Sequence, residues 1–101
     1  MKIEITKKEE GHVDIHLDGS FDASNSNQVK EEFTDCLNEG YKNYSLDFEK
    51  VEFVDSSGLG VLVGFYKKVK IGDGQLSLKN LNDSVMKIFE LTQLDKVFKI
   101  V

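Results

Sequence analysis

The sequence predicts one α/β domain in which helices connect parallel strands. Two strand-like segments open the chain, and from there helical and strand-like patterns alternate to the last residue. Parallel neighbours need a long crossover, usually a helix, so this order indicates a layered α/β fold. The 101 residues are 40% hydrophobic and 31% charged, which fits a single globular domain spanning residues 1–101.

The two opening segments predict a hairpin with one solvated face. Residues 2–7 and 12–17 both alternate between apolar and polar side chains, and the charged residues 7–11 form the turn between them. Strict alternation is typical of a strand that buries only one side.

Each predicted helix follows polar capping residues and carries apolar residues on one side. The first follows the segment Asp22–Asn27 and stops at Gly40, a typical residue just beyond a helix C-terminus. The second runs from about Gly58 to Ile71, and the third follows the segment Asn82–Ser84. The apolar positions expected to face the core are Val29, Phe33, Cys36 and Leu37 in the first helix, Leu59, Leu62, Val63, Tyr66 and Val69 in the second, and Val85, Ile88 and Phe89 in the third.

Three further strands complete a sheet of about five. Short apolar patterns mark them at residues 44–48, 76–78 and 97–101. The Gly-Asp-Gly turn at residues 72–74 separates the second helix from the fourth strand.

Charge and cysteine content exclude several classes of protein. A formal net charge of −5 offers no clustered basic face to nucleic acid or to an acidic membrane surface. No apolar run reaches the roughly 20 residues of a membrane span. Cys36 has no partner for an internal disulfide, which is typical of a reducing compartment. We therefore expect a cytoplasmic protein that binds neither nucleic acid nor membrane.

No metal or cofactor is expected. His12, Asp14 and His16 share one side of the second strand, and we interpret them as the solvated face of the hairpin and not as a zinc site. The glycines that follow position 57 do not match the dinucleotide-binding fingerprint.

The most informative motif is Asp-Ser-Ser-Gly-Leu-Gly at residues 55–60, between a predicted strand and the second helix. Its glycines remove side-chain cover on either side of Leu59. One interpretation is structural: serine is among the best N-cap residues, so Ser56 or Ser57 could cap the helix. The other is a phosphorylation switch, because a helix N-terminus offers unpaired N–H groups and the positive end of its dipole to an anion.

Three segments carry a family resemblance: Gly-Ser-Phe-Asp at 19–22, Val-Asp-Ser-Ser-Gly-Leu-Gly-Val-Leu-Val-Gly at 54–64, and Phe-x2-Thr-x-Leu at 89–94. In this order and spacing, the chain resembles the bacterial anti-sigma factor antagonists, which are single-domain STAS proteins. The resemblance covers nearly the whole chain. It implies a mixed β-sheet with helices mainly on one face, and a regulatory protein that is not an enzyme.

The resemblance also implies how the motif works. Ser56 is the residue that a partner anti-sigma factor, itself a serine kinase, would phosphorylate. The unphosphorylated form would bind this partner and free the sigma factor, and a metal-dependent serine phosphatase would reset the switch. Spacing alone does not choose between Ser56 and Ser57; the resemblance favours Ser56. The residues expected to bind the partner are Asp22, Asp55, Ser56, Ser57, Gly58, Leu59 and Gly60.

One position departs from the family pattern. Ser20 stands where relatives often carry an acidic residue before the apolar-Asp pair. Asp22, which is implied to contribute to recognition, therefore has less negative charge around it than its counterparts do.

Three alternative functions start from other features. Asp55 could accept a phosphoryl group as in a receiver domain, but no adjacent acidic pair and no clear partner lysine accompany it. A hydrolase would need a base near Ser56, and no histidine follows that serine. The same fold could also serve as a phosphoacceptor or scaffold module in another signalling pathway.

Overall fold

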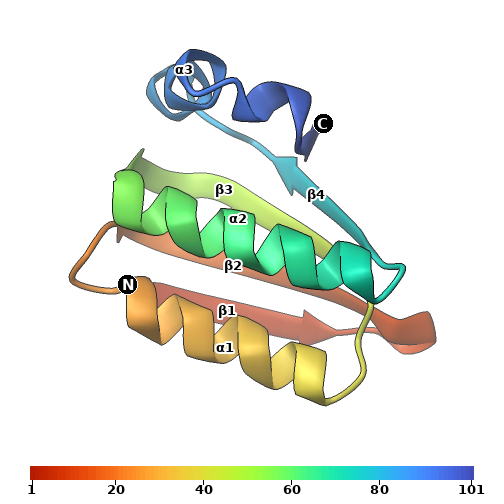
Figure 1. Ribbon diagram of the computed structural model, residues 1–101. Coiled ribbons are helices and arrows are strands. Elements are labelled where there is room, and N and C mark those ends of the chain that lie inside the picture. The colour runs from red at the N-terminus through yellow and green to blue at the C-terminus, as the bar shows by residue number, and fades with distance from the viewer.

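The computed structural model describes residues 1–101, and its single five-stranded sheet follows the order of the chain (Figure 1). The strands are β1 (Lys2–Lys7), β2 (His12–Phe21), β3 (Asn43–Val54), β4 (Gln75–Lys79) and β5 (Lys99–Ile100). β1 pairs with β2 in the antiparallel sense, and every later pair is parallel. The predicted α/β class and the mixed sheet are confirmed.

Three helices supply the crossovers between the parallel strands. They are α1 (Ser26–Asn38), α2 (Ser56–Ile71) and α3 (Asp83–Leu91), and two short 3-10 segments lie at Glu9–Gly11 and Leu94–Lys96. α1 and α2 lie side by side across the same face of the sheet, and α3 packs beside the end of β3 (Figure 1). None of these helices has the length and apolar content that crossing a membrane would need.

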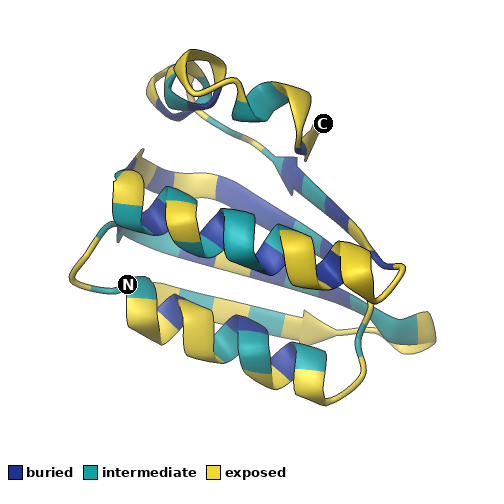
Figure 2. Ribbon diagram, in the orientation of Figure 1, coloured by how far each residue is buried: buried dark blue, intermediate teal, exposed yellow.

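The core lies between the helices and the apolar side chains of the sheet. Phe65 of α2 stacks on Phe33 of α1 with ring centroids 4.1 Å apart, and it meets Tyr44 of β3 edge-on at 4.7 Å. Tyr66 of α2 contacts the buried ring of Phe98 at 5.1 Å. Figure 2 shows buried residues recurring along α1, α2 and β3. The aromatic contacts therefore tie both helices to the sheet and to each other.

The buried side of α2 differs from the prediction. Leu62 and Val69 are buried as expected, and the other large buried side chain is Phe65. The predicted core positions of α2 that are only partly buried are Leu59, Val63 and Tyr66. The difference arises because α2 is apolar around most of its circumference, so the spacing of apolar residues does not orient it by itself.

The closing strand is shorter than predicted. Of residues 97–101, only Lys99–Ile100 belong to β5. The chain first makes the 3-10 turn Leu94–Lys96, and Val97 keeps right-handed helical dihedrals. The chain therefore joins the sheet only beyond Phe98, whose side chain is buried in the core.

The face of the sheet opposite the helices carries polar side chains that pair with one another, as expected for the solvated side of the hairpin. Asp14 accepts a 2.6 Å contact from Lys8 Nζ and lies 3.0 Å from His12 Nε2. No group of three His, Cys, Asp or Glu side chains gathers in a way that could hold a metal ion.

Asp47 is the one buried acid on this face, with 6% of its surface exposed. Its Oδ1 accepts hydrogen bonds from the N–H of Glu49 at 2.9 Å and from Nδ2 of Asn80 at 3.1 Å, and its Oδ2 lies 3.3 Å from His16 Nδ1. Burial alone would raise the pKa of the Asp47 carboxyl. The two hydrogen bonds, together with electrostatic attraction to His16 and Lys79, outweigh burial and hold this pKa below its ordinary value.

A carboxyl whose pKa is lower in the folded state stabilises the fold above its unfolded pKa of about 3.9, and this stability is lost as the pH falls through the folded value. We expect Asp47→Asn to lower the free energy of unfolding at pH 7 by about 1.5–3 kcal/mol, the range for hydrogen bonds to a charged group. Urea titrations between pH 6 and pH 3 should show a shallower acid loss in the variant. Glu49→Gln, at an exposed position, is the control, and identical pH profiles for Asp47→Asn and wild type would contradict the argument.

Candidate functional site

The candidate site forms where β2 and β3 end side by side. Phe21, the last residue of β2, pairs with Val54, the last residue of β3. The N–H of Asp55 then donates to the carbonyl of Phe21 at 3.1 Å, and the N–H of Ala23 donates to Asp55 Oδ2 at 3.3 Å. The turn after β2 and the start of α2 therefore lie together, at the carboxyl edge where open α/β sheets place ligand sites.

Asp55 caps α2. Its Oδ1 accepts the N–H of Gly58 at 3.0 Å, and its carbonyl accepts the N–H of Leu59 at 2.9 Å. The interpretation in which Ser56 or Ser57 caps a helix that begins near Gly58 is therefore wrong, because the helix begins at Ser56 itself. A carboxylate has two oxygens, so one oxygen of Asp55 accepts from the helix N-terminus while the other accepts from the neighbouring turn.

The two serines occupy the first two positions of α2 and differ in exposure. Ser56 is exposed, whereas Ser57 is partly buried and lines a groove between α1 and α2. Because Asp55 is the cap, both hydroxyls are free of that role. Main-chain N–H groups at the first positions of a helix have no partner in the preceding turn and favour an anion. Ser56 is therefore the more accessible hydroxyl at this helix N-terminus.

Asp22 organises the turn after β2 and does not cap α1, which begins at Ser26. Its Oδ1 accepts hydrogen bonds from the hydroxyl of Ser24 at 2.5 Å and from the N–H of Ser24 at 2.9 Å. Both hydrogen bonds lower the pKa of the Asp22 carboxyl below its ordinary value, and the bond from the hydroxyl contributes more than the bond from the N–H. Asp22 is thus a carboxylate at neutral pH, in the same turn that hydrogen-bonds to Asp55.

Asn25 holds this turn together, and sequence reasoning missed it. Its Oδ1 accepts the N–H of Asp22 at 3.0 Å, and its Nδ2 donates to the carbonyl of Ser20 at 2.5 Å. The available signal was the polar run before α1, since asparagine side chains commonly bond to nearby backbone in turns. That run contains several equivalent residue types, so the sequence did not single out Asn25.

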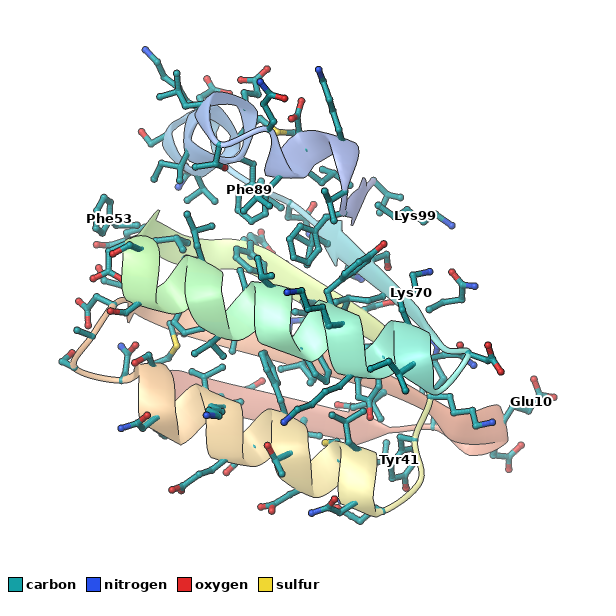
Figure 3. All side chains as sticks on the ribbon, in the orientation of Figure 1. Glu10, Tyr41, Phe53, Lys70, Phe89 and Lys99 are labelled. Carbon is teal, nitrogen blue, oxygen red and sulfur yellow. The ribbon has the colours of Figure 1, made fainter.

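Phe53 is a second residue without a predicted role. It lies near the end of β3, two residues before Asp55; the residue is 48% exposed, and its ring points away from the core (Figure 3). Exposed aromatic rings are enriched among the residues that anchor protein interfaces. Phe53 therefore adds an apolar contact surface next to the acidic and hydroxyl groups of the motif.

The glycines of the site have different structural roles. A Cβ on Gly58 would lie 2.5 Å from the carbonyl oxygen of Phe21, so α2 can approach β2 only because this residue is glycine. A Cβ on Gly60 would meet nothing within 4 Å. Gly19 has φ +119°, a conformation that favours glycine, where the register of β2 shifts between Gly19 and Ser20. This irregularity precedes the turn at Asp22.

Comparison with known proteins gives consistent results for the whole chain. The family model described as "STAS domain" matches residues 4–101. The anti-sigma-B factor antagonist of Listeria monocytogenes is 34% identical over 101 residues, which span 99% of this chain and 88% of that protein. A candidate anti-sigma factor antagonist of Thermotoga maritima has a crystal structure that matches with a TM-score of 0.91 at 28% identity, covering 97% of this chain and 84% of that chain.

SpoIIAA, an anti-sigma factor antagonist from Bacillus, matches in two forms. Its unphosphorylated structure has a TM-score of 0.86 at 23% identity, covering 99% of this chain and 88% of that chain. Its phosphorylated structure has a TM-score of 0.78 at 22% identity, covering 99% and 91%. At this level of identity the likeness concerns the fold alone.

The cap assignment predicts a difference between neighbouring residues. We expect Asp55→Ala to lower the free energy of unfolding by about 0.5–2 kcal/mol, because the N–H of Gly58 loses its acceptor. Ser57→Ala, a control substitution in the first turn of the same helix, should alter the free energy of unfolding by less than about 0.5 kcal/mol. Urea denaturation followed by circular dichroism measures both. Equal losses at the two positions would show that Asp55 is not the cap.

We expect substitution by alanine to have opposite effects on stability at Gly58 and at Gly60. Gly58→Ala should lower the free energy of unfolding by about 1–3 kcal/mol, because the new methyl group displaces the main chain at Phe21. Gly60→Ala should raise it by up to about 1 kcal/mol, because alanine is the better helix former and its methyl group meets no atom. Thermal unfolding of the pair tests this, and a loss of stability in Gly60→Ala would contradict it.

Proposed function

The chain belongs to the STAS domain family of anti-sigma factor antagonists, and from this premise we propose that its unphosphorylated form binds an anti-sigma factor that is a serine kinase and so releases a sigma factor. Phosphorylation of Ser56 by that kinase would end the binding. The observation that carries this proposal is the exposed hydroxyl of Ser56 at the first position of α2, next to the cap Asp55. We expect the exchange to take place in the cytoplasm, where sigma factors act.

A phosphate on Ser56 is compatible with the fold. Phosphoserine adds about −1.5 to −2 charges and three acceptor oxygens. At a helix N-terminus the dipole favours such an anion by roughly 0.3–1 kcal/mol. Because Ser56 is exposed, the phosphate needs no space in the core. The modification should therefore leave the scaffold intact and act on the partner.

The effect on the partner follows from the charges around the serine. Asp55 is adjacent, and the turn that holds the Asp22 carboxylate is hydrogen-bonded to it through Ala23. A phosphate added to this acidic edge repels an acidic partner surface or fills a close contact. Unfavourable charge contacts at interfaces cost several kcal/mol, and every 1.4 kcal/mol or so is tenfold in affinity. A hundredfold switch is therefore physically reasonable.

The interface that we propose contains the whole motif. Asp22, Asp55 and the segment Ser56–Gly60 lie at one edge of the sheet, and the exposed ring of Phe53 extends it with an apolar contact. A metal-dependent serine phosphatase would need the same access to Ser56 as the kinase does.

The alternative functions gain no support from the geometry. As a receiver-like phosphoacceptor, Asp55 would need a free carboxylate, yet one of its oxygens accepts from Gly58 and the other from Ala23. Service as a STAS module in a different signalling pathway would use the same serine with a different partner. We propose the antagonist role because the Listeria monocytogenes relative, whose match covers 99% of this chain, carries that name.

Treatment with the anti-sigma factor of the same organism and ATP tests the proposal. We expect mass spectrometry to place one phosphate on Ser56, Ser56→Ala to remain unlabelled and bound, and Ser56→Asp to bind at least tenfold more weakly while keeping its melting temperature. Ser57→Ala should still carry its phosphate on Ser56. A label on Ser57, or equal affinity of labelled and unlabelled protein, would overturn the assignment.

A further inference from the structure

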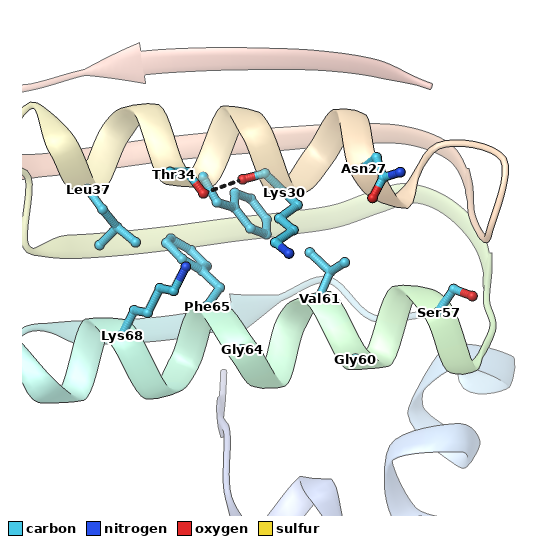
Figure 4. Close-up of a pocket in the computed structure, with 11 residues that line it drawn as sticks. Asn27, Lys30, Thr34, Leu37, Ser57, Gly60, Val61, Gly64, Phe65 and Lys68 are labelled. Carbon is cyan, nitrogen blue, oxygen red and sulfur yellow. Dashed lines mark hydrogen bonds between the residues drawn. The ribbon is translucent and has the colours of Figure 1, made fainter.

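A groove of about 350 Å³ runs between α1 and α2 (Figure 4). The two helices run in the same direction, and the groove extends along α2 from Ser57 to Lys68, a length of about 16 Å at the rise of an α-helix. Its apolar lining includes Leu37, Val61 and Phe65. The groove therefore begins one residue from Ser56 and continues the proposed interface along the outer surface of the helices.

Gly60 and Gly64 open this groove without serving the fold. They lie one helical turn apart, both line the groove, and a Cβ on either would meet nothing within 4 Å. Neither has a positive φ, so neither backbone position requires glycine. Glycine is the poorest helix former after proline. The fold therefore does not require glycine at either position. Two glycines on one side of a helix allow the main chain of another segment to approach closely.

The charge at the groove is opposite to that of the chain as a whole. Lys30 reaches from α1 and Lys68 from α2, and both amines point into the space between the helices (Figure 4). Neither forms an ion pair, whereas the three lysines that do, Lys2, Lys7 and Lys8, all lie at or beside β1. In a chain of net charge −5, two unpaired ammonium groups over an apolar groove favour an occupant that is acidic and partly apolar.

We propose that this groove receives an acidic amphipathic helix of the anti-sigma factor. This inference rests on the proposed function and adds the chemistry of the docking segment. About three turns of helix fill the 16 Å groove, with small apolar residues over the two glycines and acidic side chains beside the two lysines. A phosphate on Ser56 would lie at the mouth of the groove, where it repels the same acidic helix that the lysines attract.

The test compares two double variants with the same change in net charge. Lys30→Glu with Lys68→Glu reverses the charge at the groove, and Lys67→Glu with Lys87→Glu reverses it at exposed lysines that do not line the groove. Calorimetry with the purified anti-sigma factor of the same organism should show at least tenfold weaker binding for the first pair and less than twofold for the second. Equal effects of the two pairs would overturn the inference.

Substitution of Gly64 tests the close approach of the main chain. Gly64→Leu should weaken binding at least tenfold by filling the groove. Gly64→Ala should raise the melting temperature and still weaken binding severalfold, which separates loss of docking from loss of folding. If both variants bound within twofold of wild type, the groove would not be the docking site. Loss of self-association in Gly64→Leu without an effect on the anti-sigma factor would assign the groove to a second copy and overturn the proposal.

The same variants distinguish a failure of the helix-docking inference from a failure of the proposed function. If the groove variants bind like wild type and Ser56→Asp binds weakly, the helix-docking inference fails and the proposed function remains. If wild type itself does not bind the anti-sigma factor, the proposed function fails, and the inference that rests on it fails too.

Discussion

The close approach of α2 to the end of β2 is the constraint on which the site depends. The carbonyl of Phe21 accepts the N–H of Asp55, and one helical turn later the main chain at Gly58 lies against the same carbonyl. This contact fixes the helix N-terminus at the sheet edge. It leaves room for no side chain at position 58, and it gives the capping role to Asp55. Ser56 consequently begins the helix with an exposed hydroxyl that is not needed to cap it.

In the proposed switch, the electrostatics of this edge act on the bound partner and leave the fold unchanged. The N-terminal end of α2 tolerates added negative charge, because the helix dipole and free N–H groups favour it. A protein that approaches the edge meets the carboxylates of Asp55 and Asp22, and along the groove it meets the lysines at 30 and 68. Attraction and repulsion are therefore arranged along one surface, and a single modification can change their balance while the core stays packed.

The sequence predicted the fold better than the details of the site. Alternation in β1 and β2 and the apolar stripes of the helices identify the elements, because burial imposes those periods. The apolar pattern does not identify the buried side of α2, because most of that helix is apolar and Phe65 is buried through its contacts with Phe33 and Tyr44. The cap and the turn residue Asn25 depend on how two distant segments meet. Neighbouring Asp, Ser and Asn residues are similar candidates until the tertiary structure is known.

The order of the strands in the sheet equals their order in the chain, and this has a consequence for how the protein is made. Each strand pairs with the next one in sequence, so no strand has to wait for a partner that lies beyond its neighbour in the chain. Synthesis proceeds from the N-terminus at roughly 5–20 residues per second. The sheet can therefore grow strand by strand as the polypeptide leaves the ribosome.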